Sequence, residues 1–171
     1  AVDIGSAFEY LHSFTPAIIH RDLKSLNVLR ANDGVLKVCD FGLVKNRNVT
    51  AGTPSYMAPE LLQAKSYNKS VDSYAFGILF NEICNGQIPF NGVAIPDIRD
   101  RCLRGERPHQ TKSIMQPQFI ALIDKCWAQD PTARPDFSQI VDELMVIYDQ
   151  LPATKYTTNL SGGDMLDSLM T

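Results

Sequence analysis

Eight consecutive residues, His20-Arg21-Asp22-Leu23-Lys24-Ser25-Leu26-Asn27, carry most of the chemical information in this chain. They match the pattern H-R-D-L-x-x-x-N at every fixed position. A second polar motif, Asp40-Phe41-Gly42, starts thirteen positions after Asn27. A three-residue motif recurs by chance, but the eight-residue match followed at this spacing by the second motif is specific.

The side chains in these two motifs are of the types that phosphoryl transfer from ATP requires. A carboxylate such as that of Asp22 can orient a hydroxyl group and take its proton. Asn27 and Asp40 offer amide and carboxylate oxygens, which suit the hard ion Mg²⁺. On these residues the sequence resembles the eukaryotic protein kinases.

The resemblance covers about residues 1–149 and implies an α+β, protein-kinase-like fold. These positions are similar to the mostly helical C-terminal lobe of a kinase, with a short β-hairpin at the active site. Lys24-Ser25-Leu26-Asn27 and the later Cys126-Trp127, Asp130-Pro131 and Arg134-Pro135 are most similar to serine/threonine kinases of the tyrosine-kinase-like group. We expect a partial kinase domain over 1–151 and a flexible tail over 152–171.

The resemblance assigns the reacting groups. It implies that Asp22 is the catalytic base and that the ammonium group of Lys24 neutralises charge on the transferred phosphoryl group. It also implies that Thr53 contacts both of them, as in serine/threonine kinases. Taken alone, Asp22 also fits a surface loop and Lys24 a solvated position.

The same resemblance implies the cofactors ATP and Mg²⁺. Asn27 and Asp40 are expected to bind the metal beside the nucleotide phosphates, and Leu29 is expected to lie under the adenine ring. From the residues alone, Leu29 fits a plain core position equally well. Asn27 and the Asp40-Phe41-Gly42 motif also fit simple turns.

Residues 43–60 are predicted to be irregular and end in A-P-E, which closes the activation segment of the family. Their part at 45–50 is polar and lacks periodicity, which is typical of a loop. Arg21 is expected to pair with a phosphate on this segment, because a guanidinium suits bidentate contacts. Thr50 is the candidate phosphosite, and Ser55 is the second choice.

Two residues are expected to hold the motifs in place. His20 is expected to pack against Phe41, which with Gly42 begins the activation segment. Asp72 is expected to hold the backbone of the first motif, although its position also suits the positive end of a helix dipole.

Two further expectations concern the core. Glu60 and Arg134 are expected to form a structural ion pair, as their counterparts do in the family. Cys39 is expected to be a buried, inert thiol, and Trp127 a core residue.

Apolar residues at helical spacing predict helices over about 1–13, 70–85, 119–127 and from 138 onward. A further helix is expected over about 96–104, ending at Gly105. Ser138 is the expected N-cap of the last helix. Its expected inner face comprises Ile140, Val141, Leu144, Met145, Ile147, Tyr148 and Leu151. Residues 28–30 and 36–39 are predicted to form a hairpin around the turn at 32–34.

Composition limits the function classes. The 171 residues are 44% hydrophobic and 20% charged with a net charge of −3, which does not suggest nucleic acid as a partner. The four cysteines are scattered, which favours reduced thiols in a cytoplasmic protein. No apolar run is long enough for a membrane span, although the cytosolic portion of a receptor-type kinase stays an alternative.

The chain contains no G-x-G-x-x-G and no V-A-I-K-like run, which kinases use to hold ATP. In the family these lie upstream in a smaller N-terminal lobe, so we expect that lobe of the same polypeptide as a partner, beside protein substrates. The 171 residues alone are expected to be inactive. A pseudokinase or regulatory scaffold is one alternative, and a small-molecule kinase of related fold is another.

Overall fold

The computed structural model describes residues 1–44 and 52–151. The candidate phosphosite Thr50 and the tail from 152 onward lie outside the described residues. The elements follow one another as α1 Val2–His12, η1 Ser25–Asn27, β1 Val28–Arg30, β2 Leu36–Val38, η2 Pro54–Tyr56, α2 Pro59–Leu62, α3 Ser70–Asn85, α4 Ile95–Leu103, α5 Pro117–Cys126, η3 Pro131–Ala133 and α6 Phe137–Gln150.

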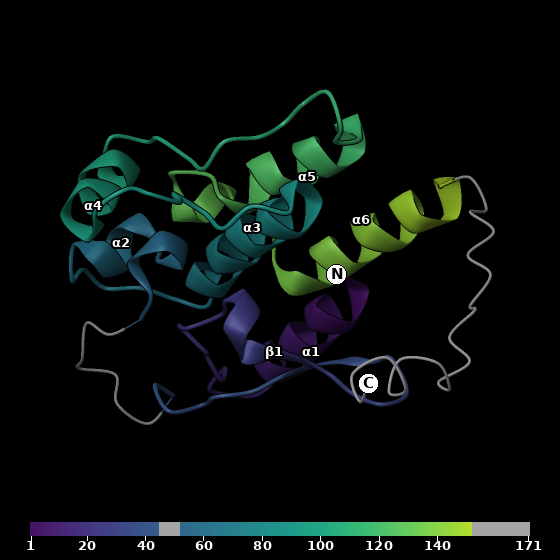
Figure 1. Ribbon diagram of the computed structural model, residues 1–171. Helices are drawn as coiled ribbons and strands as arrows, with labels where there is room; N and C mark the ends of the chain where they lie inside the picture. The colour runs from purple at the N-terminus through teal and green to yellow at the C-terminus, as the bar shows by residue number, and fades with distance from the viewer. Residues whose placement is uncertain (45–51, 152–171) are drawn as a thin grey trace, which may run out of the picture.

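Helix α3 is the central element of the described fold (Figure 1). Every residue from Val71 to Asn81 is buried, as predicted from apolar residues on more than one face. Helix α5 packs closely on α3 at Gly77, where an added Cβ would stand 2.9 Å from the Cβ of Cys126. Gly86 ends α3 with a left-handed backbone, φ 64°.

Helices α1 and α6 pack on each other. Phe8 of α1 stacks on Phe137 of α6 with ring centroids 4.8 Å apart. One turn earlier on α1, Gly5 lets the Val141 side chain approach closely. The apolar stripe predicted for residues 1–13 therefore forms a helix that buries Ile4 and Phe8.

The hairpin forms as predicted. Strands β1 and β2 are antiparallel, and Val28 is paired with Val38. Gly34 has φ 87° in the turn, a conformation that glycine adopts without a steric penalty. Asp3 of α1 accepts a hydrogen bond from the backbone N–H of Leu36 at 3.0 Å, which connects the hairpin to the helical body.

Three details of the sequence prediction are wrong. Helix α6 begins at Phe137, and its N-cap is Asp136 and not Ser138, because Asp136 and Gln139 form a capping box. Met145 and Tyr148 are 45% and 67% exposed, so they do not belong to the inner face of α6. The segment 43–60, predicted as irregular, contains the short helix η2 and the first two residues of α2.

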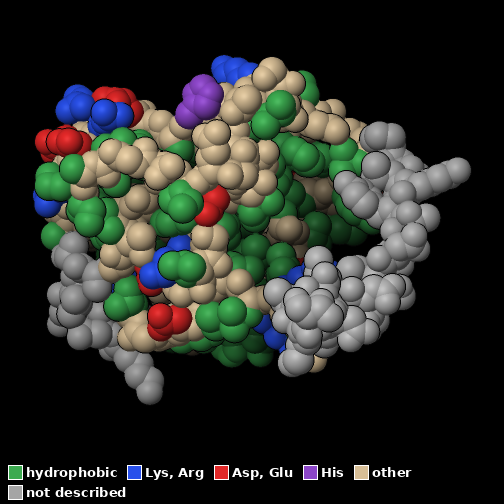
Figure 2. All heavy atoms as spheres, viewed as in Figure 1, with side chains coloured by type: hydrophobic (Ala, Val, Ile, Leu, Met, Phe, Trp, Pro, Cys, Tyr) green, Lys and Arg blue, Asp and Glu red, His purple; other side chains and the backbone are tan. Residues whose placement is uncertain are grey.

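The helical body and the two-stranded sheet confirm the predicted α+β class. Within 1–44 and 52–151, no helix is both long and apolar enough to span a bilayer. All four cysteines are free thiols, and Cys39 is only half-buried. On the face drawn in Figure 2, acidic and basic side chains are interspersed among uncharged and apolar ones.

Candidate active site

The central helix fixes the backbone of the first motif through one carboxylate. Asp72 of α3 has no exposed surface. Its Oδ2 accepts from the backbone N–H of His20 at 2.9 Å, and its Oδ1 from that of Arg21 at 2.8 Å. Arg21 has φ 66°, a backbone conformation that a non-glycine residue keeps only when its surroundings enforce it.

The two motifs are in direct contact through His20. Its ring packs edge-on against Phe41 with centroids 5.0 Å apart. Its Nε2 donates to the backbone carbonyl of Cys39 at 3.0 Å, and its Nδ1 accepts from the backbone N–H of Asp22. The imidazole is fully buried and therefore acts as a link between the two loops.

Asp22, Lys24 and Thr53 form a compact polar triangle. The Nζ of Lys24 donates to Asp22 Oδ2 at 2.9 Å and to the hydroxyl of Thr53 at 3.0 Å. The backbone N–H and the hydroxyl of Thr53 both donate to Asp22 Oδ1, at 3.1 and 3.2 Å. Residue 53 is 31 positions away from Asp22 in sequence. The end of the activation segment therefore lies directly on the first motif.

Asn27 and Asp40 have the chemistry of a magnesium site. The Nδ2 of Asn27 donates to the backbone carbonyl and to Oδ2 of Asp22, at 2.8 and 3.2 Å, which leaves the amide oxygen as its acceptor. The backbone carbonyl of Asn27 accepts from the N–H of Cys39. Asp40 is the next residue after Cys39, so this bond brings the backbone of Asp40 close to that of Asn27.

The exposed Asp40 has φ 65° and accepts from the N–H of Gly42 at 3.2 Å. One carboxylate and one amide oxygen fit Mg²⁺, which completes its shell with water and phosphate oxygens. Among the described residues no group of three or more His, Cys, Asp or Glu could hold a metal ion.

Leu29 lies on β1 and is 56% exposed. Within the described residues Leu29 is therefore not part of the hydrophobic core. An exposed apolar side chain next to the two motifs is available to contact a flat apolar group, such as a base.

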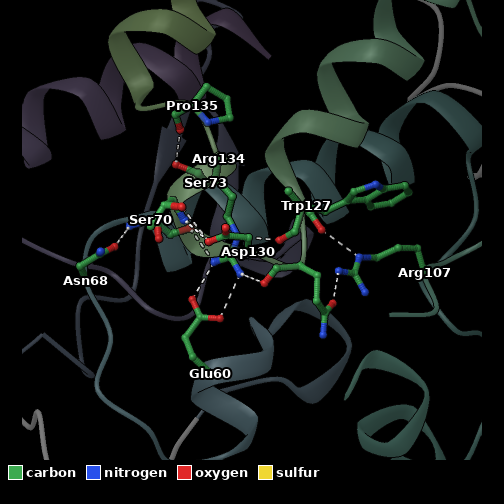
Figure 3. A network of polar contacts seen from close by, with 12 residues as sticks. Glu60, Asn68, Ser70, Ser73, Arg107, Trp127, Asp130, Arg134 and Pro135 are labelled. Atoms are coloured by element: carbon green, nitrogen blue, oxygen red, sulfur yellow. Dashed lines mark hydrogen bonds and ion pairs between the residues drawn. The ribbon is translucent and has the colours of Figure 1, made fainter. Parts of the chain in front are cut away.

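Glu60 and Arg134 form a buried, bidentate ion pair, and Figure 3 shows the carboxylate facing the guanidinium. The distances are 2.6 Å for Nη1 to Oε1 and 3.0 Å for Nη2 to Oε2. The Nε of Arg134 also donates to the carbonyl of Ala128 at 2.8 Å. The guanidinium of Arg134 lies 5.0 Å from the ring centroid of Tyr74, and that of Arg107 lies 5.1 Å from it. This network connects α2 to the loop before α6.

Sequence reasoning missed three partners of the site. Tyr67 accepts from the guanidinium of Arg21 at 3.0 Å. Glu82 of α3 accepts from the hydroxyls of Ser25 at 2.9 Å and Tyr56 at 2.7 Å. Burial raises the pKa of Tyr56, so its hydroxyl stays protonated as a donor. His12 of α1 donates from Nε2 to Asp72 Oδ2 at 2.9 Å. These partners belong to no motif, and their contacts arise only from the fold.

Comparison with known proteins agrees with this geometry. Residues 1–146 match the protein kinase domain family. The chain is 37% identical to the serine/threonine-protein kinase CTR1 of Arabidopsis thaliana, over 84% of this chain and 18% of that protein. It is 37% identical to the serine/threonine/tyrosine-protein kinase HT1 of the same species, over 92% of this chain and 43% of that protein.

Mitogen-activated protein kinase kinase kinase 10 of Mus musculus is 35% identical over 86% of this chain and 17% of its own length. The chain thus spans less than half the length of each of these three relatives. The match to the family covers most of the chain and includes both motifs. The chain therefore belongs to the protein kinase family, as its sequence predicts.

Proposed function

We propose that this chain is the catalytic-loop half of a protein serine/threonine kinase, which transfers the γ-phosphoryl group of ATP to hydroxyl groups of protein substrates. The observation that carries the proposal is the placement of the Asp22 carboxylate. It is held by Lys24, Thr53 and Asn27 within hydrogen-bond distance, and only 11% of its side chain is exposed.

In this function Asp22 orients the acceptor hydroxyl and takes its proton. The hydroxyl oxygen forms a bond to the γ-phosphorus as the bond to the β,γ-bridging oxygen breaks, and ADP leaves. Lys24 offsets negative charge on the transferred group. Asn27 and Asp40 hold Mg²⁺, which when bound neutralises charge on the phosphate oxygens.

The proposed acceptor is serine or threonine. The support is the contact of Lys24 and Thr53 with Asp22, which follows the form expected of serine/threonine kinases. The name of CTR1 gives serine/threonine, and the name of HT1 adds tyrosine. Peptides with tyrosine as the only acceptor therefore belong in any assay.

The proposed domain limits are 1–151 for the kinase portion and 152–171 for a tail. The nucleotide-holding elements that this chain lacks belong to a preceding N-terminal lobe. ATP would then be enclosed between that lobe and the surface around Leu29 and Asp40, both of which are exposed here. We expect the 171 residues alone to transfer phosphate negligibly.

The test uses the complete kinase, Mg²⁺, labelled ATP and casein. The Asp22→Asn variant is expected to lose about 10²-fold or more in kcat, because general-base catalysis of this kind contributes about 10²–10⁴-fold. Asp33→Asn is the matched control, since Asp33 lies in the hairpin turn, away from the site, and its carboxylate accepts from the N–H of Val35. Full activity in Asp22→Asn contradicts the proposal. Mg²⁺-dependent and Asp22-dependent transfer by the 171 residues alone contradicts the need for a second lobe.

The competing function is a kinase-like scaffold without catalysis. It is disfavoured because Asp22, Lys24, Asn27 and Asp40 are all present in this half of the site. An inactive complete protein that still binds a partner protein would favour the scaffold.

A further inference from the structure

The β1–β2 hairpin carries part of the proposed nucleotide site, yet it is weakly embedded in the fold. Each strand has three residues, and none of the six is buried. Val28, Leu36 and Val38 pack half-buried against the core, whereas Leu29 and Arg30 are exposed. A two-stranded ribbon of this size is marginally stable in water on its own. Its position therefore depends on specific bonds to the rest of the molecule.

One such bond holds the end of the hairpin that leads to Asp40. The backbone N–H of Cys39 donates to the carbonyl of Asn27 at 2.9 Å. Asp40 follows Cys39 directly, so this bond fixes the metal-binding end of the ribbon on the first motif. That motif is itself held by Asp72 of α3 and not by the hairpin.

A second bond comes from the first turn of α1. Asp3 Oδ2 accepts from the backbone N–H of Leu36 at 3.0 Å, across 33 positions of sequence. Leu36 begins β2 and is paired with Arg30 on β1, next to the pair of Leu29 and Lys37. Asp3 therefore connects to the helical body the part of the ribbon that carries Leu29.

The chemistry of this bond suits an anchor. A carboxylate accepts a stronger hydrogen bond from an N–H group than a neutral acceptor does. Leu36 has one backbone donor, and it uses that donor on the helix. Because a negative charge in the first turn also favours the dipole of α1, a test must separate the two effects of Asp3.

We propose that Asp3 is a positioning residue for the nucleotide, and this inference rests on the proposed function. It acts through the hairpin and does not touch ATP. By fixing the ribbon on α1, it holds Leu29 in place for the base before ATP arrives, so binding does not have to order the ribbon. Asp22 has separate support through Asp72. Loss of Asp3 therefore weakens ATP binding and leaves turnover unchanged.

The experiment compares three variants of the complete kinase. Asp3→Ala removes the acceptor, and Asp3→Asn keeps a side-chain oxygen at the same place. Asp97→Ala is the matched control, because Asp97 lies in the first turn of α4 and its loss removes the same kind of helix-dipole interaction. Figure 1 shows α4 well separated from the hairpin.

For each variant we would measure kcat, the KM for ATP and for peptide, the Kd of ATP by calorimetry without peptide, and amide hydrogen exchange over residues 28–38. Asp3→Ala is expected to raise the Kd and KM for ATP about fivefold, the size of one net hydrogen bond, and to speed exchange across the hairpin. The values of kcat and of the KM for peptide stay within about twofold. Asp3→Asn restores most of the affinity, and Asp97→Ala leaves the affinity for ATP unchanged.

The inference is overturned if Asp3→Ala leaves the Kd of ATP unchanged, if Asp3→Asn binds ATP as weakly as Asp3→Ala, or if Asp97→Ala weakens binding equally. A fall in kcat as large as the rise in KM also overturns it, because the defect then extends beyond the nucleotide. A failure of the proposed function is distinguishable. If the unsubstituted protein binds ATP but transfers no phosphate, the kinase activity is refuted, and the Kd comparison still decides the role of Asp3. If it binds no ATP, both are refuted.

Discussion

The Arg134 side chain donates hydrogen bonds to a buried glutamate and to backbone carbonyls of the surrounding loops. Its guanidinium is fully buried, pairs with Glu60 at two points and contacts the carbonyls of Ala128 and Gln129. Removing one partner of such a pair leaves an uncompensated buried charge, which costs about 3–5 kcal/mol. We therefore expect Arg134→Ala to lower the melting temperature by roughly 10 °C, measured by differential scanning calorimetry.

The matched control for this prediction is Arg104→Ala. Arg104 also pairs with a glutamate, Glu106, at 3.0 Å, but its side chain is 63% exposed. Exposed pairs contribute about 0–1 kcal/mol, so the control is expected to melt within a few degrees of the parent. If both variants lowered the melting temperature equally, the buried Glu60–Arg134 pair would contribute no more to stability than an exposed pair.

Single-residue roles could be anticipated where a motif fixes them. The side chains of Asp22, Lys24 and Thr53 meet as expected, although their roles in catalysis stay a prediction. The contacts of His12, Tyr67 and Glu82 could not be anticipated, because each joins residues far apart in sequence and no spacing rule encodes such pairs. The exposure of Leu29 likewise follows from the hairpin position and not from its residue type.

At the scale of elements, the N-terminus of α6 offers a clear test. The Asp136 carboxylate accepts from the backbone N–H of Gln139 at 3.0 Å, and the Gln139 side chain accepts from the N–H of Asp136 at 3.0 Å. Loss of an N-cap costs about 1 kcal/mol. Urea denaturation of Asp136→Ala is expected to show that loss, whereas Ser138→Ala, the cap expected from sequence, stays within about 0.5 kcal/mol. A larger loss in Ser138→Ala than in Asp136→Ala would show that Ser138 is the N-cap.

Helical periodicity located the long helices because an apolar stripe must face the core. It failed at two points for identifiable reasons. Helix α2 has only four residues, too few for a period to appear. On α6, Met145 and Tyr148 have the spacing of an inner face, yet only their neighbours Leu144 and Ile147 are buried.

At the scale of the whole molecule, α3 is the common support. Asp72 of α3 binds the backbone of the first motif, and Gly77 lets α5 pack closely. The ring of Tyr74 contacts the guanidinium of Arg134 in the Glu60–Arg134 network. The sequence predicted a buried helix here, because apolar residues cover more than one face. It did not determine which elements surround α3, since apolar contact is non-directional and many arrangements bury the same residues.

Three cysteine thiols in the fold predict that the protein loses stability at alkaline pH. Burial raises the pKa of the Cys84 thiol to about 11 and raises the pKa of the Cys102 and Cys126 thiols. In the unfolded chain thiols release their protons near pH 8.5. Above that pH the unfolded state binds fewer protons than the folded state, so the free energy of unfolding falls as pH rises.

The decrease should begin near pH 8.5 and continue through about 11, the folded-state pKa of Cys84. Each fully protonated buried thiol contributes up to about 1.4 kcal/mol per pH unit in this window. Melting temperatures measured under reducing conditions at pH 7.5, 8.5, 9.5 and 10 should be level at first and then decline. Cys126→Ala, which removes one fully buried thiol, should decline less steeply than the parent. A melting temperature that stays level to pH 10 would mean that these thiols ionise equally well in the folded state.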